Sequence, residues 1–406
     1  STVIEQDKGE TVTVAKSGGD YASIQSAIDS IDDNSASKPY AVIVYPGVYT
    51  EDITLEDWVS VTGINGRDSV VIEGTVTFAT DSSASRTSLA DLTVDLTTTS
   101  DDVSLITSGD GLNYIHNCRL LLSSTQNDHI GHLISSTDGE LKVTGCSMEL
   151  DYDGSAAGAN NFFVLAINGQ TSFDFTENDV DINVADEDDL VVFFDQTAAS
   201  SGTSFFEANE VDINCSSGSY SGIAGGFYIH GSSTEQVLGD NHLHITTSGA
   251  GTGYAVYMDT TAGSGEVHSN GNQFWVEGFG SNYSYNIASG DTMYSHFDDV
   301  RAADGRTGAG SFSYVYSDAD GDLVTSGAID SAEVTDGNIP KMGGSGLEDS
   351  LLSESGGTVD IDGDSTANTY TADATSMPST EDTDSDGADN DVSFRRYSDL
   401  TATGSG

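Results

Sequence analysis

Side chains that could carry chemistry stand two residues apart in four short segments of the chain. They are the pairs Asp179 and Asp181, Glu210 and Asp212, His242 and His244, and Gln273 and Trp275. Two carboxylates suffice for glycoside hydrolysis, so Asp181 and Asp212 are candidate catalytic residues. A carboxylate and an imidazole can share a divalent ion, which makes Asp212 and His244 a candidate metal pair. The indole of Trp275 can stack on a sugar ring while neighbouring carboxylates accept its hydroxyls. The eight residues predict a glycan or partner face, and the competing interpretation is the hydrated surface of an acid-rich protein.

A recurring apolar pair supplies the strands that would hold these side chains. The copies begin 26, 28, 34, 31, 32 and 31 residues apart, at Leu92, Cys118, Cys146, Val180, Val211, Leu243 and Phe274. The second inward residue of each copy follows two positions later, at Val94, Leu120, Met148, Ile182, Ile213, Ile245 and Val276. Because side chains alternate in direction along a strand, the residues that flank these apolar positions point outward and form one face.

A repeat of roughly 30 residues with two or three strands cannot bury its own apolar side and must stack on its neighbours. The sequence therefore predicts an all-β chain with a right-handed parallel β-helix of about ten coils over residues 41–310. Residues 1–40 form the N-terminal segment, in which Ile24, Ala27, Ile28 and Ile31 make one helical stripe behind the N-cap residue Ser23. This helix is expected to cap the first coil. A β-sandwich is the alternative, but it does not predict a register that persists over seven copies.

The net charge indicates the solvent in which the chain works. The sequence has 66 acidic and 12 basic residues, a formal charge of -54, and no Lys or Arg between Val143 and Val300. At molar salt the Debye length falls to about 3 Å, so we expect a folded halophilic protein that needs high salt and no cofactor. Nucleic acid and anionic membranes are excluded as partners, because binding either requires clustered Lys and Arg. No apolar run of about 18 residues occurs, so neither a signal peptide nor membrane insertion is expected.

Two acidic loops near the C-terminus resemble calcium sites, at residues 318–322 and 382–391. In the second loop, alternating carboxylates match the first half of an EF-hand loop, although Ser393 stands where the bidentate Glu belongs. The candidate Ca²⁺ ligands are Asp382, Asp384, Asp386, Asp389 and Asp391. The alternative is a solvated acidic tail.

Cysteines and aromatic residues suggest packing roles. Cys118 and Cys146 are expected to lie inward in adjacent coils, either as reduced thiols or close enough for a disulfide. An aromatic group near the end of the repeats either fills the core and closes the rod or forms a subunit interface. Its members are Phe274, Trp275, Phe279, Tyr283, Tyr285, Tyr294 and Phe297.

Three N-terminal motifs carry a family resemblance. They are VTVAKSGGDY at residues 12–21, IQSAI at residues 24–28 and VYPGVYTE at residues 44–51. Together they resemble the first part of the pectate-lyase-like β-helix superfamily, particularly pectin methylesterases and viral tailspikes. The resemblance implies the fold and carries over no catalytic residue. The glutamine, aspartate and arginine motifs of pectin methylesterases are not found, and the central coils lack the basic residue that pectate lyases use.

Composition changes after about residue 310. Residues 311–364 scatter single apolar side chains such as Ile339, Met342 and Leu347 among Gly and Ser, and resemble connecting segments of the tail fibres of tailed viruses. Such side chains cannot form a core within one chain, so we expect an extended neck buried between three chains. A flexible linker is the alternative. Residues 365–406 form an acidic C-terminal segment.

These features favour a structural protein on the virion surface of a halophile virus: a tail fibre, tailspike or capsid spike. We expect a homotrimer that contacts other virion proteins and attaches to a host-surface glycan or glycoprotein. One alternative is a polysaccharide depolymerase that uses carboxylates on the β-helix face. The other is an adhesion protein on the surface of the halophilic cell itself.

Overall fold

The computed structural model describes residues 9–302, with gaps at 100–102, 125–129, 153–160, 168–171, 186–189, 197–202, 231–234, 260–264 and 290, and then only short strands between residues 305 and 371. The chain divides into two compact units, Ser1–Val324 and Thr325–Gly406. The first unit contains the predicted repeats.

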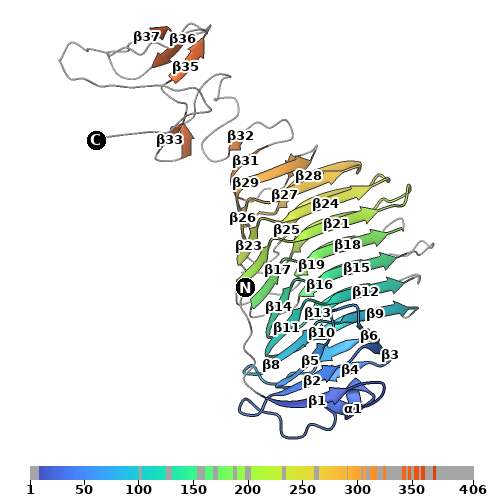
Figure 1. Cartoon of the computed structure of the whole chain (residues 1–406). Helices are drawn as coiled ribbons and strands as arrows, with labels where there is room; N and C mark the ends of the chain where they lie inside the picture. The colour runs from blue at the N-terminus through green and yellow to red at the C-terminus, as the bar shows by residue number, and fades with distance from the viewer. Residues whose placement is uncertain are drawn as a thin grey trace, which may run out of the picture. The chain divides into compact units, whose positions relative to one another are not determined.

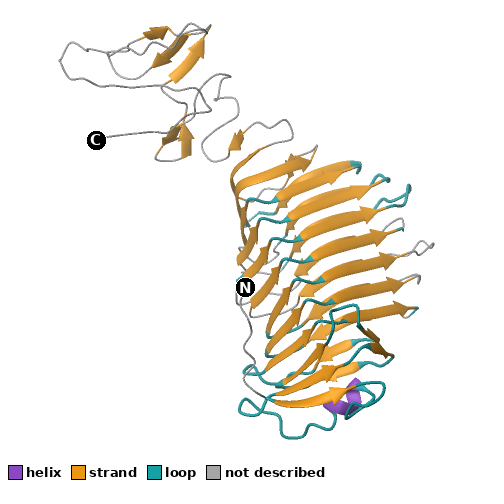
Figure 2. Ribbon diagram, viewed as in Figure 1, coloured by secondary structure: helices purple, strands orange, loops and turns teal. Residues whose placement is uncertain are grey.

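The first unit is built from three ladders of parallel strands (Figures 1 and 2). The first ladder comprises β1 (Glu10–Val14), β2 (Tyr40–Val44), β5 (Val59–Gly63), β8 (Arg86–Ala90), β11 (Leu112–His116), β14 (Glu140–Thr144), β17 (Ser172–Thr176), β20 (Ser204–Glu207), β23 (Glu235–Gly239), β26 (Glu266–Asn270), β29 (Thr292–Ala302) and β31 (Ser311–Ser317). The second comprises β3 (Gly47–Tyr49), β6 (Val70–Glu73), β9 (Thr93–Thr98), β12 (Arg119–Ser124), β15 (Ser147–Tyr152), β18 (Asp179–Val184), β21 (Glu210–Cys215), β24 (His242–Thr247) and β27 (Gln273–Glu277). The third comprises β4 (Ile53–Leu55), β7 (Val76–Phe78), β10 (Val103–Ser108), β13 (Ile130–Ser136), β16 (Asn161–Ile167), β19 (Leu190–Gln196), β22 (Ile223–Ile229), β25 (Thr252–Met258), β28 (Ser281–Ile287) and β30 (Gly305–Thr307).

Each coil contributes one strand to each ladder. Within the described residues, the strands β2 to β28 make nine complete coils, and β29 and β30 continue the stack. The predicted all-β parallel β-helix is confirmed. The parallel pairing also includes β31, which lies beyond the boundary predicted at residue 310.

The predicted capping helix is α1 (Ile24–Ile28), at the N-terminal end of the stack (Figure 2). Ile24, Ala27 and Ile28 are buried, as the apolar stripe predicts. Ser23 caps the helix by accepting a hydrogen bond from the Ser26 amide. The carboxylate of Glu51 accepts from the Ser23 hydroxyl at 2.6 Å and from the Ile24 amide at 2.9 Å. The segment that carries the family resemblance therefore joins the cap to the first coils.

The bore of the solenoid is filled by superposed apolar side chains. Val180, Val211 and Leu243 pair directly in register, which confirms the central geometric prediction. In the middle coils the bore is filled by phenylalanine rings packed mostly edge to face or tilted, whose centroids lie 4.7 to 6.3 Å apart in contacting pairs. These rings are Phe173, Phe175, Phe193, Phe194, Phe206 and Phe227, all fully buried or nearly so.

One step of the predicted register is wrong. Met148, not Cys146, pairs with Val180, so the spacing predicted as 34 residues is two residues shorter. Cys146 occupies instead the position that Asn178 takes in the next coil, since the Cys146 amide donates to Asn178 Oδ1 at 2.9 Å. The sequence misled because Cys146 is apolar and stands two residues before an inward residue, whereas later coils place a buried asparagine there.

These asparagines form a ladder through the wall of the solenoid. We use asparagine ladder for Asn178, Asn209, Asn241 and Asn272, which are at most 2% exposed. The side-chain oxygen of each accepts from the backbone amide one coil earlier, at 2.9 to 3.2 Å. Each side-chain nitrogen donates to the next member, and the last donates to the carboxylate of Asp298. Buried amides thereby replace water as partners for the backbone at this turn.

In the second unit, the described residues contain only short antiparallel strands. β33 (Lys341–Gly343) pairs with β34 (Gly346–Glu348), and β36 (Thr358–Ile361) pairs with both β35 (Leu352–Ser355) and β37 (Thr369–Thr371). The two candidate calcium loops lie outside the described residues, as does most of the predicted neck. The loops are residues 318–322 and the segment that carries Asp382, Asp384, Asp386, Asp389 and Asp391. No helix among the described residues is long and apolar enough to span a membrane.

Candidate binding face

The second ladder presents the predicted residues on its outward side. With the register corrected, one outward column runs Thr93, Arg119, Ser147, Asp179, Glu210, His242, Gln273 and Asp299. The neighbouring column runs Asp95, Leu121, Glu149, Asp181, Asp212, His244, Trp275 and Arg301. The structure thus brings all eight predicted residues together over four consecutive coils. We call them, with Glu277, the acid–histidine face.

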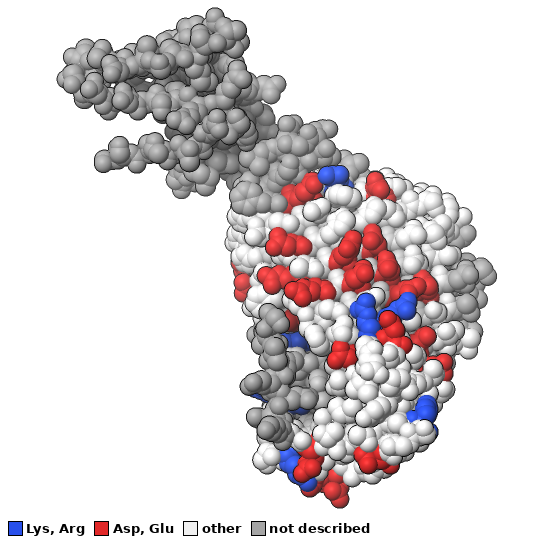
Figure 3. Space-filling view, in the orientation of Figure 1, with Lys and Arg blue, Asp and Glu red and all other residues white. Residues whose placement is uncertain are grey.

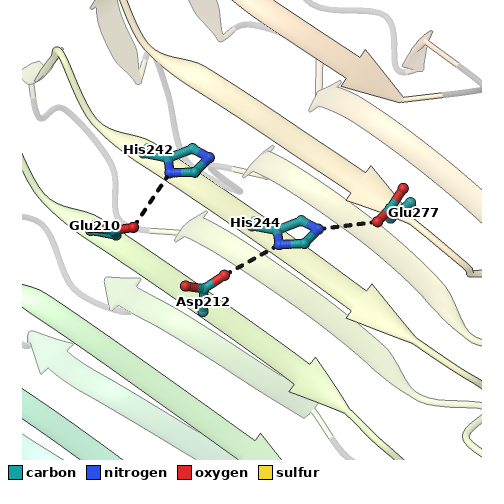
Figure 4. A network of polar contacts seen from close by, with 5 residues as sticks. All are labelled: Glu210, Asp212, His242, His244 and Glu277. Atoms are coloured by element: carbon teal, nitrogen blue, oxygen red, sulfur yellow. Dashed lines mark hydrogen bonds and ion pairs between the residues drawn. The ribbon is translucent and has the colours of Figure 1, made fainter.

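Histidine side chains link carboxylates of adjacent coils (Figure 4). His244 lies between Asp212 and Glu277, with Nδ1 3.2 Å from Asp212 Oδ1 and Nε2 3.2 Å from Glu277 Oε1. A neutral imidazole carries one N–H and can donate to only one of these carboxylates, whereas an imidazolium donates to both. His242 Nδ1 lies 3.8 Å from Glu210 Oε1, so this pair interacts mainly through charge when the histidine is protonated.

The same geometry argues against a metal site at His244. The carboxylates of Asp212 and Glu277 contact opposite edges of the imidazole, so their oxygens and one ring nitrogen do not converge on a point. Among the described residues, no group of three or more His, Cys, Asp or Glu side chains is placed to hold a metal ion. The divalent ion predicted between Asp212 and His244 therefore finds no support in the coordination geometry.

Trp275 is packed between neighbouring coils. The guanidinium of Arg301 lies 4.4 Å from the centroid of the indole ring. The rings of His242 and His244 lie 4.8 and 5.7 Å away, both steeply inclined to the indole. Arg301 would have to move for a sugar to stack on the indole face it covers. Glu277 is more accessible to a ligand than the indole of Trp275, since its side chain is 70% exposed.

Carboxylates crowd the earlier coils of this face, and Figure 3 shows acidic side chains gathered over this side of the solenoid. Partial burial raises the pKa of Asp181, and the nearby charges of Asp179 and Asp212 raise it further. Glu149 likewise has a raised pKa, from burial and the charge of Asp151, although Arg119 Nη2 lies 3.5 Å from it. Only the protonated form of such a carboxyl group can donate a hydrogen bond, whereas the ionised form only accepts.

Two contributors to this face were missed from the sequence. Asp299 and Arg301 flank the buried Val300 in an eighth outward pair, which continues the pattern one coil beyond the repeats that the sequence reveals clearly. Alternating polar and apolar residues at 299–302 were the available sign of this pair. The spacing from the preceding copy is shorter than in the coil before it, because the single strand β29 belongs to both the first and the second ladder.

The remaining predicted residues divide between the bore and the surface. Cys118 and Cys146 are free, buried thiols, so the reduced alternative is the one observed. Phe274, Phe279 and Tyr285 are buried, as core filling predicts. Tyr283 and Tyr294 instead stack on outward neighbours, Tyr254 and His268 respectively. The side chain of Phe297 lies outside the described residues.

Comparison with known proteins shows no family for this chain. A scan against protein-family models finds no match, and a search of curated proteins also finds none. A crystal structure of PfbA, a surface adhesin of Streptococcus pneumoniae, is similar to this chain with a TM-score of 0.26 and 10% sequence identity, covering 80% of this chain and 93% of that one. A likeness at this level carries no argument about function. The β-helix assignment depends on the strand pairing in the chain itself.

Proposed function

We propose that the protein is an extracellular attachment rod that works in brine, and specifically a tail fibre, tailspike or capsid spike on the surface of a halophile virus. The observation that carries this proposal is the acid–histidine face. Hydrogen-bonding side chains are held there in register over consecutive coils, with spacings fixed by the ladder rather than by loops. A repeated face of this kind suits a repeated ligand such as a surface glycan.

Charge supports a glycan over other partners. The chain has a formal charge of -54, so an anionic nucleic acid or membrane would be repelled, whereas a neutral glycan would not. In the proposed homotrimer, three copies of the face would bind together, and weak single contacts would add up to firm attachment. The viral assignment rests on the fibre-like composition of residues 311–364 and on the resemblance of the N-terminal motifs to those of tailspikes.

The test is binding of the purified chain to intact halophilic cells in molar salt. Saturable co-sedimentation with the cells is expected, with mass measurement showing a trimer. Antibodies raised against the chain should label the outside of virions. Label confined to the surface of uninfected cells would instead support the alternative of a cellular adhesion protein.

A second candidate function, glycoside hydrolysis, is favoured by one observation. Asp181 pairs in register with Asp212, and its raised pKa suits a general acid beside a second carboxylate. A depolymerase would shorten surface polysaccharide from the same cells, and Asp181→Asn would abolish the shortening. Polysaccharide of unchanged length after prolonged incubation with the purified chain would exclude this function.

A further inference from the structure

The outward side of the third ladder carries a strip of tyrosines that the acid–histidine face does not include. Tyr228 and Tyr257 stack with ring centroids 4.3 Å apart, and Tyr254 and Tyr283 stack at 5.3 Å. The two stacks touch, because Tyr254 and Tyr257 meet edge to face at 5.2 Å. We call these four residues the tyrosine face. They extend over three coils, or about 10 Å at the usual strand spacing, which is roughly the length of two sugar rings.

The tyrosine face lies outside the main core. Tyr228 packs with Val192 in an apolar cluster separate from the bore, and Tyr257 leans against that cluster. Tyr254, Tyr257 and Tyr283 keep part of their surface exposed, whereas Tyr228 is only 9% exposed. The exposed rings therefore lead toward a recessed end of the strip.

A buried carboxyl group stands at that recessed end. Asp195 pairs in register with Tyr228 one coil earlier and is 6% exposed. None of the described residues makes a hydrogen bond to it, and its nearest ionic neighbour, His230 Nε2, lies 4.0 Å from Asp195 Oδ1. A buried polar group without a partner is costly, and a ligand hydroxyl would supply that partner.

The character of this group points to a neutral ligand. Burial raises the pKa of Asp195 to about 7, so near neutrality the carboxyl is protonated much of the time and does not present a full negative charge. Burial also lowers the pKa of His230, which favours the neutral imidazole. Apolar contact with aromatic side chains and hydrogen bonding to a neutral acid both persist in molar salt, in which charge attraction is screened.

We propose that the tyrosine face binds a neutral glycan, with the partly exposed side chains of Tyr254, Tyr257 and Tyr283 in apolar contact with sugar rings and Asp195 hydrogen-bonded to a hydroxyl. This inference deepens the proposed attachment function, on which it rests for the source of the glycan. A protein partner fits less well, since a flat surface that covers the exposed tyrosines does not reach the recessed Asp195. A sugar hydroxyl is small enough to do so.

The test is titration of the full chain with neutral tetrasaccharides of glucose, mannose and galactose in molar potassium chloride at pH 7. The wild type is expected to bind at least one of them. Tyr257→Ala should weaken binding about tenfold, the equivalent of one lost aromatic contact of about 1.4 kcal/mol, and Tyr257→Phe should keep it within about threefold. Asp195→Leu should also weaken binding about tenfold, whereas Asp195→Asn, which retains hydrogen bonding, should preserve it. The matched control is Asn214→Ala, at an exposed outward position on the second ladder.

Each contrary result has a distinct meaning. No binding of any tetrasaccharide by the wild type would overturn the proposal, as would equal binding by Tyr257→Ala and wild type. A Tyr257→Ala variant that loses subunits but keeps its sugar affinity would identify the tyrosine face as a subunit interface instead. Sugar binding by a chain that fails to attach to cells would overturn the attachment function alone. Attachment that persists in Tyr257→Ala after sugar binding is lost would remove this face from that function.

Discussion

Truncating one member of the asparagine ladder tests how the coils are held in register. In Asn209, Oδ1 accepts from the Asn178 amide at 3.0 Å, and Nδ2 donates to Phe175 O at 2.9 Å and to Asn241 Oδ1 at 2.8 Å. Oδ1 of Asn209 also accepts from Asn178 Nδ2 at 3.1 Å, so Asn209→Ala removes four contacts and leaves the buried Asn178 amide without its acceptor. An orphaned buried donor costs about 1–3 kcal/mol and each net hydrogen bond about 1 kcal/mol, so we expect a loss of about 3 kcal/mol.

The assay is urea unfolding in molar salt, with Asn214→Ala as the matched control. Asn214 is an exposed residue of the same coil, so its truncation should change stability by no more than about 0.5 kcal/mol. With a slope of about 3 kcal/mol per molar urea, Asn209→Ala should lower the midpoint by about 1 M. Hydrogen exchange at the Asn178 amide should accelerate in parallel.

A double variant sharpens the test. The side chains of Asn209 and Asn241 share one hydrogen bond, which both single changes remove, so Asn209→Ala with Asn241→Ala should cost less than the two single changes added together. An Asn209→Ala midpoint equal to that of Asn214→Ala would refute the ladder as a source of stability. Strict additivity in the double variant would refute the coupling between its members.

Three further predictions concern burial and charge. The pKa of Asp195 is raised to about 7 in the fold and returns to about 3.9 on unfolding, so the native state binds more protons between these values. The free energy of unfolding should therefore fall by up to about 4 kcal/mol as pH rises from about 4 to about 7. Asp195→Asn should lose this part of the pH dependence. Identical stability–pH profiles for the variant and the wild type would contradict the raised pKa of Asp195. Burial raises the pKa of the Cys118 thiol well above its usual range. A thiol reagent should therefore label the buried thiols of Cys118 and Cys146 only as fast as the fold opens. Labelling at the rate of the denatured protein would contradict their burial. Dilution from molar to about 0.1 M salt lengthens the screening distance from about 3 to about 10 Å, so the thermal midpoint should drop, and a midpoint independent of salt would contradict the predicted need for brine.

The repeat could be predicted because alternation and stacking impose the same constraint on every coil. Val211 and Leu243 lie one above the other in the bore and must both be apolar, so apolar residues recur in the sequence at the length of one coil. The slip at Cys146 arose because an apolar side chain and a buried asparagine occupy the same turn in different coils. An asparagine two residues before each later inward position, as at Asn209 and Asn241, was the available sign of the ladder.

The acid–histidine face followed from the same alternation, whereas the tyrosine face did not. The lengths of the connections between ladders vary from coil to coil, so the sequence does not show which residues of the third ladder pair with one another. Tyr283 was therefore grouped with Phe274 by proximity in the chain, although it stacks on Tyr254 from the preceding coil. The unpaired burial of Asp195 depends on such neighbours and has no sequence signature.

The most direct test of the attachment function is to compare binding of the intact chain to halophilic cells before and after periodate oxidation of their surface glycans, in molar salt throughout. We predict saturable binding to untreated cells, loss of most of it after oxidation, and displacement of the bound chain by glycan released from untreated cells. Equal binding to oxidised and untreated cells, with no displacement by released glycan, would contradict the account.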